Sequence, residues 1–452
     1  MLRSPWLLSS ALHRRIFALR PRPHELSKRV GGRCLSEVPS FRERLAQSAM
    51  KEVAVESFTE RVKKPRIGWQ IYYVVMSGLG IYLISAKAAN VETAIWTERL
   101  KQSAVFQDKD PTSDDIKRAK YFHLGKRLQA MILEINNSVS NLPNTVKSMP
   151  ILATARSMQN YLDASEARRV CWTIVLYNTC IFLAWKIPRA RSFMNRAFTH
   201  DPLSGRSYTL FTSVFSHSSF WHLVLNSMAL TSFTATAAQY FIREQRNSPT
   251  AMPEASVRQH LFAFYICSGL FASLFSHVAW TRIVYPRIVS RIASPTSPAK
   301  GLFRRAVTAD TQINPSLGAS GAIYASVVVT ALAFPDAEIS LFFPPGLTLP
   351  IQWGVGGFVL LDIIGILRGW RFFNHWAHLG GAIFGGLYYA WGPSWWDGVR
   401  QWDMSALGNI SYRGDDSALR KEIALGVKQL AKEEEEWDRI IAANSHKKPR
   451  PG

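Results

Sequence analysis

Residues 317–333 read LGASGAIYASVVVTALA, a run that contains no charged residue and places small residues around a serine near its start. Similar uncharged runs lie before and after it along the chain. A bilayer core of about 30 Å needs about 20 helical residues, because unpaired backbone polar groups are not tolerated in hydrocarbon. The runs therefore predict membrane-spanning helices.

Seven such runs predict an all-α, polytopic membrane protein. The first run is separated from the other six by a mixed-charge region at 90–169, so the pattern is one helix, a long loop and a compact group of six. The second run is short, but Arg169 and Lys186 can snorkel and extend it. The predicted spans are 67–86, 170–185, 219–242, 261–280, 317–333, 347–367 and 372–391.

Composition narrows the class of protein. The 452 residues carry 54 Lys and Arg against 32 Asp and Glu, a formal charge of +22. Because the basic residues flank the hydrophobic runs, this charge fits a membrane better than a nucleic acid, and no nucleic-acid partner is expected. Four cysteines without a C-x-x-C pair exclude a disulfide scaffold and a cysteine zinc site.

The first 36 residues have the composition of a targeting segment. They hold eight Lys or Arg and a single acid, Glu25, and four apolar residues fall on one helical face. A basic, acid-poor amphipathic helix of this kind predicts a mitochondrial transit peptide at 1–36. The alternative is a disordered basic tail. Residues 37–66 are then a soluble stub in the matrix.

Loop charges predict the orientation in the membrane. Three loops on one side hold 13 basic residues, whereas the two alternate loops hold 3. With seven spans, the basic N-terminus lies on the same side as the basic loops, which predicts a matrix N-terminus and a C-terminus in the intermembrane space. The predicted organisation is an extra N-terminal transmembrane helix at 67–86, an intermembrane-space loop at 87–167, a six-helix core at 168–392 and a soluble tail at 393–452.

Polar side chains inside spans are costly and are therefore functional candidates. Three predicted spans run in the same direction and carry such groups near the same end, within about ten ångströms of one surface at 1.5 Å per residue. Residues four apart share a helix face. The groups are His222 with Asn226, Ser320 with Tyr324 one turn later, and His378.

Acyl transfer requires a serine, a histidine and amide donors close together, and here they lie at one depth in the membrane. A histidine can take a serine proton near neutral pH, which predicts Ser320 as the nucleophile and His378 as the general base. Attack on a peptide carbonyl creates an oxyanion that needs fixed donors. His222 and Asn226 are the candidates, together with the Ser320 backbone N–H.

Glycines beside these residues support the same interpretation. Gly318 and Gly321 let a substrate backbone approach and let the chain turn into the helix, while Gly381 and Gly385 let the seventh helix pack closely on its neighbour. The G-x-S-G string alone is a weak signal, since small-residue helix contacts produce it by chance. It is not the G-x-S-x-G elbow, because position 322 is alanine.

Several residues leave alternatives open. His375 and His378 have the spacing of two metal ligands, but a third ligand is not evident, so no metal is expected. His217, His277 and His375 are interpreted as structural hydrogen-bonding residues, and Tyr324 can be simple packing. Asp362 is the one acid inside a span. A carboxylate that is solvated or paired with nearby arginines is favoured over the third member of a triad.

The chain resembles the rhomboid family of intramembrane serine proteases at these residues. The matching strings occur in the family's order on a six-helix core at about 168–392. They are His222-x-x-x-Asn226, Gly318-x-Ser320-Gly321-x-x-Tyr324 and Ala377-His378-x-x-Gly381-x-x-x-Gly385. The extra N-terminal span and the transit peptide resemble the mitochondrial, presenilin-associated branch. The loop 186–208 lacks the Trp-Arg pair of some bacterial members.

The resemblance implies a Ser320–His378 dyad without an acidic member, with Tyr324 stacked under His378 and an oxyanion hole lined by His222 and Asn226. It also implies a protease that needs no metal or organic cofactor, located in the mitochondrial inner membrane. The expected substrates are single-span membrane proteins cut in or near their transmembrane helix. Dynamin-like GTPases and presequence-anchored precursors are candidates by resemblance.

Two other functions are considered. A catalytically inactive rhomboid-like protein that binds membrane clients would use the same helices, but such relatives typically lose the serine or the histidine. A transporter would show inverted repeats and broken helices, and the spans contain no internal repeat. The tail at 415–448 has an amphipathic pattern, for which a solvated surface helix is favoured over a docking site.

Overall fold

The computed structural model describes residues 65, 67–293, 315–340, 346–370, 372–411 and 417–445. The chain divides into two compact units, Met1–Ser57 and Phe58–Gly452, and all described residues belong to the second. The predicted transit peptide at 1–36 lies outside the described residues, as does almost all of the predicted stub at 37–66.

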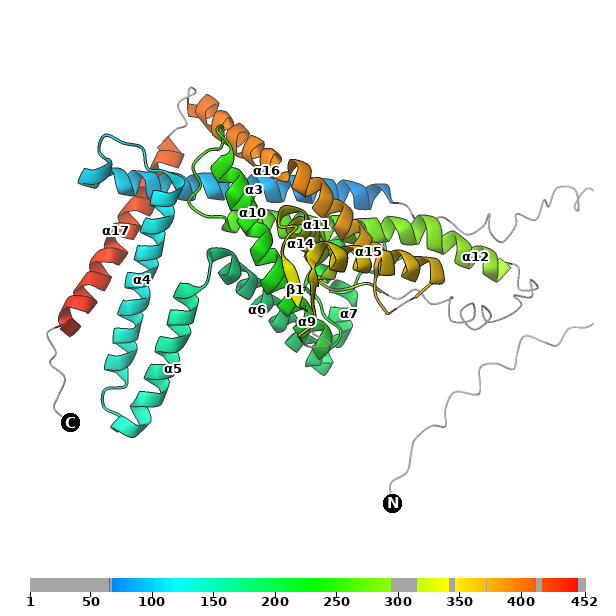
Figure 1. The fold of residues 1–452 in the computed structure, drawn as a ribbon, viewed down its shortest axis with the longest axis horizontal. Coiled ribbons are helices and arrows are strands. Elements are labelled where there is room, and N and C mark those ends of the chain that lie inside the picture. Colours follow the sequence, from blue (N-terminus) through cyan, green and yellow to red (C-terminus); the bar gives the residue numbers. More distant parts are fainter. Residues whose placement is uncertain are drawn as a thin grey trace, which may run out of the picture. The chain divides into compact units, whose positions relative to one another are not determined.

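The described part of the chain consists of helices apart from one short hairpin (Figure 1), which confirms the all-α prediction. The hairpin pairs β1 (Glu338–Ser340) antiparallel with β2 (Thr348–Pro350). The helices are α3 (Gly68–Lys101), η1 (Ala104–Phe106), α4 (Ser113–Ser138), α5 (Asn144–Asp163), α6 (Glu166–Lys186), η2 (Pro188–Ala190), α7 (Arg191–Ala197), α8 (Thr209–Thr212), η3 (Ser213–Phe215), α9 (Phe220–Ala229), η4 (Leu230–Thr234), α10 (Ala235–Asn247), α11 (Arg258–Ala279), η5 (Trp280–Val284), α12 (Tyr285–Ala293), α14 (Ser320–Ala333), α15 (Ile351–Arg368), α16 (His375–Ser411) and α17 (Ser417–Ser445).

Each predicted span overlaps a helix, although the lengths differ. Among the described residues, three helical segments are long and apolar enough to cross a membrane: Gly68–Lys101, Arg258–Ser290 and Ile351–Arg368. A bent pair, Glu166–Lys186 followed by Pro188–Ala197, would be a fourth. The shorter α14 reaches only about 21 Å at 1.5 Å per residue. The polytopic class is therefore confirmed, whereas the count of seven spans stays a prediction.

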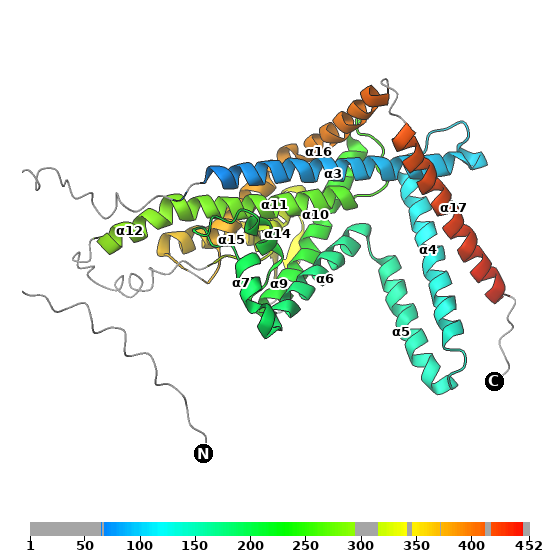
Figure 2. The same ribbon diagram turned by 180° about the vertical axis from the view of Figure 1, so that it is seen from behind.

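The helix α11 is the centre of the packing and contacts α3, α14 and α16 (Figures 1 and 2). One large cluster of buried apolar side chains joins these helices. It includes Leu261 and Phe264 of α11 together with Ala322 and Val329 of α14. Burying such side chains is the main favourable term in folding. As a result α14, which begins at the predicted nucleophile, is held between α11 and α16.

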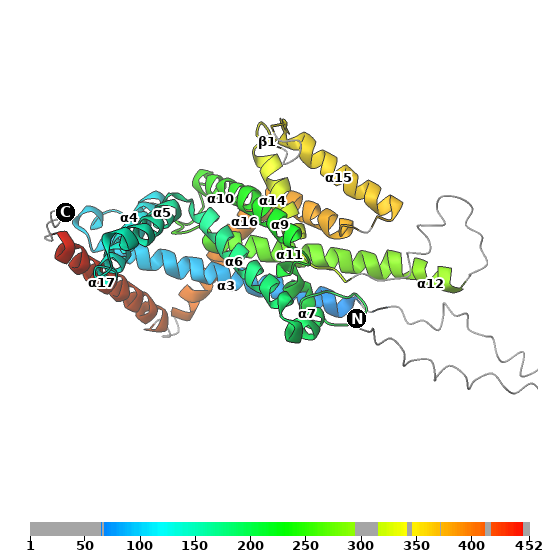
Figure 3. The ribbon, with the colours of Figure 1, turned by 90° about the horizontal axis from the view of Figure 1, so that it is seen from below.

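The helices α4 and α17 pack on the end of α3 that extends past the predicted span, and α5 packs on α4 (Figure 3). α4 begins with a capping box, in which Thr112 accepts the Asp115 backbone N–H and the Asp115 carboxylate accepts the Thr112 N–H at 3.0 Å. Residues 87–167, which were predicted to form an intermembrane-space loop, are thus largely helical, and α4 within them begins at a defined cap.

The C-terminal helix α17 packs on α3 and α4, so the interpretation as a solvated surface helix is wrong. Val427 is buried, and Gly426 lies so close to α3 that a Cβ there would fall 2.5 Å from Ile95 Cδ1. The amphipathic pattern therefore marks a face that docks within the same chain. Two ion pairs add to this contact: Lys126 with Asp438 at 2.9 Å, and Arg99 with Glu434.

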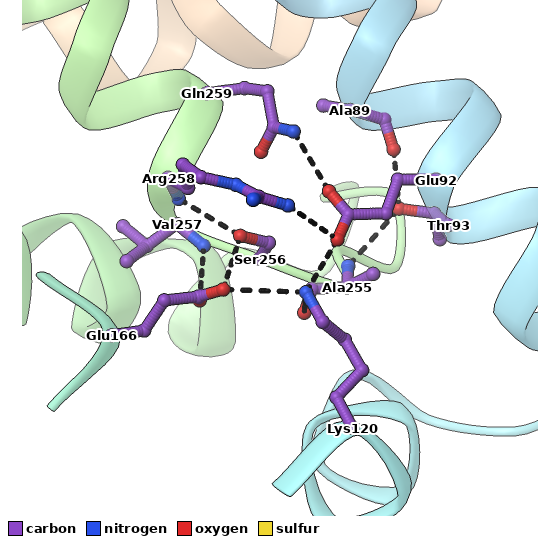
Figure 4. A network of polar contacts seen from close by, with 10 residues as sticks. All are labelled: Ala89, Glu92, Thr93, Lys120, Glu166, Ala255, Ser256, Val257, Arg258 and Gln259. Atoms are coloured by element: carbon purple, nitrogen blue, oxygen red, sulfur yellow. Dashed lines mark hydrogen bonds and ion pairs between the residues drawn. The ribbon is translucent and has the colours of Figure 1, made fainter. Parts of the chain in front are cut away.

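A network of charged side chains joins α3, α4 and the first turns of α6 and α11 (Figure 4). Lys120 of α4 donates to Glu92 of α3 at 2.6 Å and to Glu166 of α6 at 3.3 Å. Glu166 accepts the Ser256 hydroxyl at 2.6 Å, and Arg258 of α11 donates to Glu92 at 2.9 Å. Every charge in the network has an opposite charge beside it, which offsets the cost of partial burial.

The last helix of the bundle, α16, continues past the predicted core boundary at 392. Its outer half carries the buried Arg400, whose Nε donates to Asn90 Oδ1 of α3 at 2.9 Å. The Trp396 indole donates to the buried Glu254 carboxylate at 3.2 Å, and burial raises the pKa of Glu254 to about 7. These contacts fix the outer half of α16, and with it the whole helix, against α3 and the loop before α11.

Candidate active site

Ser320 is the first residue of α14 and is half-buried. The turn before it is held by backbone hydrogen bonds: Ser316 and His200 exchange two at 2.9 Å, and the Gly318 N–H donates to the Ser213 carbonyl at 2.9 Å. Gly318 has φ of +128°, a conformation that favours glycine. This glycine lets the chain turn sharply into the helix, which fixes the position of the Ser320 hydroxyl.

The structure brings the predicted nucleophile and general base together. His378 Nε2 lies 3.0 Å from Ser320 Oγ, which is within hydrogen-bonding reach. His378 lies in the first turn of α16, where Asn374 accepts the Ala377 N–H at 3.1 Å and the Ser276 hydroxyl of α11 at 2.9 Å. Asn374 thus caps α16 and ties its start to α11, so the imidazole is held by a fixed helix end.

Glycines place α16 directly on α14. A Cβ on Gly381 would fall far inside van der Waals contact with the Gly321 carbonyl oxygen, and a Cβ on Gly385 would lie 2.5 Å from the Ala325 carbonyl oxygen. The two helices pack backbone to backbone at these positions, as small residues allow in membranes. His378 is one turn before Gly381 on the same face, so this contact brings it within reach of Ser320.

The predicted oxyanion residues lie on one face of α9. Ser219 caps this helix by accepting the His222 backbone N–H at 3.2 Å. The His222 ring packs against the turn before the nucleophile, where a Cβ on Gly318 would lie 2.9 Å from His222 Cε1. The Asn226 amide donates to the His222 carbonyl at 2.9 Å, within its own helix. The His222 ring thus lies beside the turn that leads to Ser320, and the role of His222 and Asn226 as oxyanion donors stays a prediction.

Asp362 contradicts the interpretation as a carboxylate that is solvated or paired with arginine. It is 2% exposed, and it is one of only four buried residues of α15. Its Oδ1 lies 3.1 Å from His378 Nδ1 and 2.6 Å from His375 Nδ1, and its Oδ2 accepts the Tyr324 hydroxyl at 2.6 Å. An acid therefore contacts the imidazole, which the resemblance to an acid-free dyad does not imply.

Tyr324 and Gly365 shape the space around these groups. The Tyr324 ring lies parallel to the His378 imidazole, with centroids 4.8 Å apart and an angle of 9°, which matches the stacking that the resemblance implies. Gly365, one turn after Asp362, makes room for the second histidine, because a Cβ there would lie 2.5 Å from His375 Nε2. Three successive helices thus contribute to one compact polar cluster.

The same cluster has a donor set that metals can use. The ligand atoms of Asp362, His375 and His378 all lie within 4.8 Å of one another, so the third ligand that the sequence did not reveal is present. Both Nδ1 atoms, however, lie at hydrogen-bond distance from a single carboxylate oxygen. Two imidazole N–H groups and a tyrosine hydroxyl satisfy that carboxylate fully, so the geometry needs no ion.

The other histidines make buried contacts. His277 Nδ1 lies 3.0 Å from His200 Nε2, in agreement with the structural hydrogen-bonding role predicted for His277. His200 was not singled out from the sequence, and its Nδ1 lies 2.8 Å from the Thr209 hydroxyl. His217 is fully buried, with its ring 5.0 Å from that of His222, and neither ring nitrogen has a hydrogen-bond partner among the described residues.

Sequence reasoning missed the contact of Asp362 with His378 and the part of His375 in it. The available signal was the isolation of Asp362 as the one acid inside a predicted span, since such a residue usually pairs within the protein interior. Its partner could not be chosen from spacing alone. The contact joins different helices and depends on how α15 is rotated.

Comparison with known proteins agrees with this geometry. A family model described as the Rhomboid domain matches residues 204–394. Presenilin-associated rhomboid-like protein A, mitochondrial, of Danio rerio is 29% identical over 258 residues, 57% of this chain and 56% of that protein. The Homo sapiens presenilin-associated rhomboid-like protein, mitochondrial, is 27% identical over 231 residues, 51% of this chain and 50% of that protein.

Rhomboid protein 1, mitochondrial, of Saccharomyces cerevisiae is 29% identical over 233 residues, 50% of this chain and 53% of that protein. The chain thus spans about half the length of the curated relatives it matches. No solved structure gives a significant match. The matched domain contains Ser320, His378, Asp362, His222 and Asn226, and the relatives are named as mitochondrial. Residues 204–394 of this chain match the Rhomboid domain, and the chain is similar to the mitochondrial, presenilin-associated rhomboid-like proteins.

Proposed function

We propose that the protein is an intramembrane serine endopeptidase of the mitochondrial inner membrane, which cleaves single-span membrane proteins in or near their transmembrane helix. The observation that carries the proposal is the 3.0 Å contact between Ser320 Oγ and His378 Nε2 at the start of two apposed helices. A serine beside a correctly placed base is the minimal unit for acyl transfer.

The first half of the reaction follows from this contact. His378 Nε2 takes the Ser320 proton while Oγ bonds to the scissile carbonyl carbon, whose electron pair moves onto oxygen. The backbone N–H of Ser320 and the nearby His222 and Asn226 are the candidate donors to that oxyanion. When the intermediate collapses, the imidazolium gives its proton to the leaving amine and an acyl-enzyme on Ser320 remains.

The second half repeats these steps with water. His378 takes a proton from a water molecule, the resulting hydroxide attacks the ester, and Ser320 leaves with the proton that the imidazole returns. Neither half requires a metal ion or an organic cofactor. The expectation that Gly318 and Gly321 make room for a substrate is wrong, because a Cβ on Gly318 would lie 2.9 Å from His222 Cε1 and one on Gly321 would lie 2.6 Å from Ala272 Cβ. The proposed reaction needs a substrate helix that unwinds locally, so that Ser320 can reach a backbone carbonyl.

The proposed substrates are single-span proteins whose helix contains small or helix-breaking residues. Dynamin-like GTPases and presequence-anchored precursors of the inner membrane are the candidate clients by resemblance. The proposed orientation places the N-terminus in the matrix and the C-terminus in the intermembrane space, from the loop charges. A protease-protection experiment on intact mitoplasts that finds the C-terminal tail in the matrix would reverse this orientation.

The experiment that tests the activity is labelling of the purified protein with a fluorophosphonate, which reacts only with activated serines. We expect labelling of the wild type, and none of Ser320→Ala or His378→Ala. The matched control is Ser326→Ala, because Ser326 lies on the same helix but bonds to Thr234 and to the helix backbone. Labelling that survives in Ser320→Ala would refute the assigned nucleophile.

A second readout separates the enzyme from an inactive client-binding relative. The purified protein is reconstituted with a single-span reporter substrate, and the fragments are measured over time. Cleavage that disappears in Ser320→Ala supports a protease. Stable co-purification of an intact reporter, without labelling of a demonstrably folded wild type, would favour the client-binding alternative.

A further inference from the structure

The helix α5 carries large apolar side chains that the described part of the chain leaves exposed. Met149 is 74% exposed, Leu152 68% and Val146 54%. Because these residues are three apart in one helix, they line one side of it, and we call them the α5 stripe. A contiguous apolar surface is rare on a folded protein and marks a place where something binds.

The opposite side of α5 packs on α4. Its half-buried apolar residues recur every three or four positions along that side: Ile151, Ala155, Met158 and Leu162. Figures 1 and 2 show α5 on the side of α4 that faces α6, and α17 on the other side of α4. The α5 stripe therefore points away from α4 and α17, toward the level at which α6 begins.

Aromatic and basic side chains mark the level of the bilayer surface at the end of α5. Only two residues separate α5 from α6, which carries the predicted span 170–185. At this junction the exposed rings of Tyr161 and Trp172 lie 6.2 Å apart, and the Arg169 guanidinium lies 5.3 Å from the Tyr161 ring. Exposed Tyr and Trp beside Arg are typical of the membrane–water interface, where the rings contact lipid and the charge reaches the headgroups.

We propose that α5 is an interfacial helix, whose stripe binds the lipid surface of the bilayer beside the core. Lipid is the occupant that fits, because α6 carries its own exposed apolar side chains, Leu176 and Leu183, and α5 continues this surface crosswise to α6 (Figures 1 and 2). Arg156, one turn after Leu152, is exposed on the same side and can reach the headgroups while the stripe contacts acyl chains. This membrane contact lies outside the active site and does not depend on the activity of Ser320.

The test measures how deeply the α5 stripe lies in a bilayer. Full-length protein with a fluorescent amino acid at position 149 is reconstituted in nanodiscs of phosphatidylcholine, with and without lipid that bears a nitroxide quencher near the headgroup end of its acyl chains. The control label is at position 435, because the Glu435 side chain is 70% exposed and belongs to α17, on the other side of α4. Phosphatidylcholine has no net charge, so contact with it reports the apolar stripe and not the basic residues.

We expect the label at 149 to be quenched at least about fivefold more strongly than the label at 435, because an interfacial helix buries its apolar face about 5–10 Å into the boundary between headgroups and acyl chains. Equal quenching at the two positions would overturn the proposal, since α5 would then face water. Emission at 149 that shifts to the blue without being quenched would also overturn it. The stripe would in that case be covered by protein, such as a second copy of this chain.

A substitution shows whether the apolar side chains themselves make the contact. With the label at 146, Met149→Asp combined with Leu152→Asp should reduce quenching to the level of the control at 435, because a carboxylate is costly to place among acyl chains. Leu425→Asp is the matched variant: Leu425 is 67% exposed but belongs to α17, so quenching at 146 should persist. The melting temperature in detergent should match the wild type in both variants, since the substituted side chains are exposed. Undiminished quenching in the folded double variant would refute the role of the stripe.

Discussion

The imidazole of His378 lies flat on the ring of Tyr324, with centroids 4.8 Å apart and an interplanar angle of 9°. The hydroxyl of the same tyrosine donates a hydrogen bond to Asp362. Asp362 in turn contacts Nδ1 of His378, the ring nitrogen that does not face Ser320. One side chain thus limits both the tilt of the base and the rotation of the acid. These two effects can be separated by substitution.

Tyr324→Phe should keep the stacked ring and lose only the hydrogen bond to Asp362. We expect the initial cleavage rate to fall by about threefold to tenfold, which corresponds to one ordinary hydrogen bond of about 1 kcal/mol. Tyr324→Ala also removes the ring that supports His378, and its rate should be lower again by at least about tenfold. Equal rates for the two variants would show that the ring itself does not position the base.

Gly381→Ala should separate α14 from α16, because its Cβ would collide with the Gly321 carbonyl oxygen. Overpacking of this kind costs about 1–3 kcal/mol, and the displacement would also move His378 away from Ser320. We expect a lower melting temperature in detergent and loss of fluorophosphonate labelling. The matched control is Gly386→Ala on the same helix, where a Cβ meets nothing within 4 Å and labelling should persist.

Gly318→Ala should disturb the turn that leads into the nucleophile. Its φ of +128° is strained for alanine, and the added Cβ would lie 2.9 Å from His222 Cε1. Because small displacements of reacting groups can cost about 100-fold in rate, we expect a loss of that order in kcat. Gly205→Ala is the control: it also has a positive φ, of +69°, but open space around it. If both variants lose activity equally, backbone strain and not the crowding of His222 is responsible.

Glu254 should make stability depend on pH. Burial raises its pKa from 4.5 to about 7, so the folded state holds this proton more tightly than the unfolded state. The associated stability is complete below about pH 4.5 and is lost as the pH rises through about 7. We expect the melting temperature of the wild type to fall between pH 5 and pH 8 by more than that of Glu254→Gln.

The half-exposed Glu244, on the preceding helix α10, is the control for this measurement. Glu244→Gln should leave the wild-type pH profile unchanged, because Glu244 is half-exposed and lies outside the buried contacts of Glu254. A wild-type profile that is flat from pH 5 to pH 8 would contradict the buried, proton-holding state of Glu254.

Sequence patterns predicted the parts of the site that depend on local spacing. His222 and Asn226 share a face because they are four residues apart in one helix, and Gly381 and Gly385 follow His378 for the same reason. The spans were also predictable, since a bilayer restricts the backbone to helices with apolar surfaces. The contact of Ser320 with His378 required the order and direction of the spans as well, which loop charges provided.

The features that the sequence did not predict depend on how a helix is rotated about its axis and on which helices pack against each other. Whether Asp362 faces lipid, water or His378 is decided by the rotation of α15, and an 18-residue apolar helix gives little information about its own rotation. The docking of α17 depends on Gly426 lying opposite Ile95, far away along the chain. From the sequence alone, the charged face of α17 fits exposure to solvent as well as it fits docking. The residues that pair with these charges are on other helices, so the sequence of α17 does not reveal them.

The order of the site residues along the chain has a consequence for biogenesis. The nucleophile at 320, the acid at 362 and the base at 378 lie on three successive helices, and the base comes last. A chain that has been made or imported only through α14 carries an ordinary, unreactive serine. Under the proposed mechanism, Ser320 would gain its base only when α16 is in place, so an incomplete or misinserted copy would carry no activated serine.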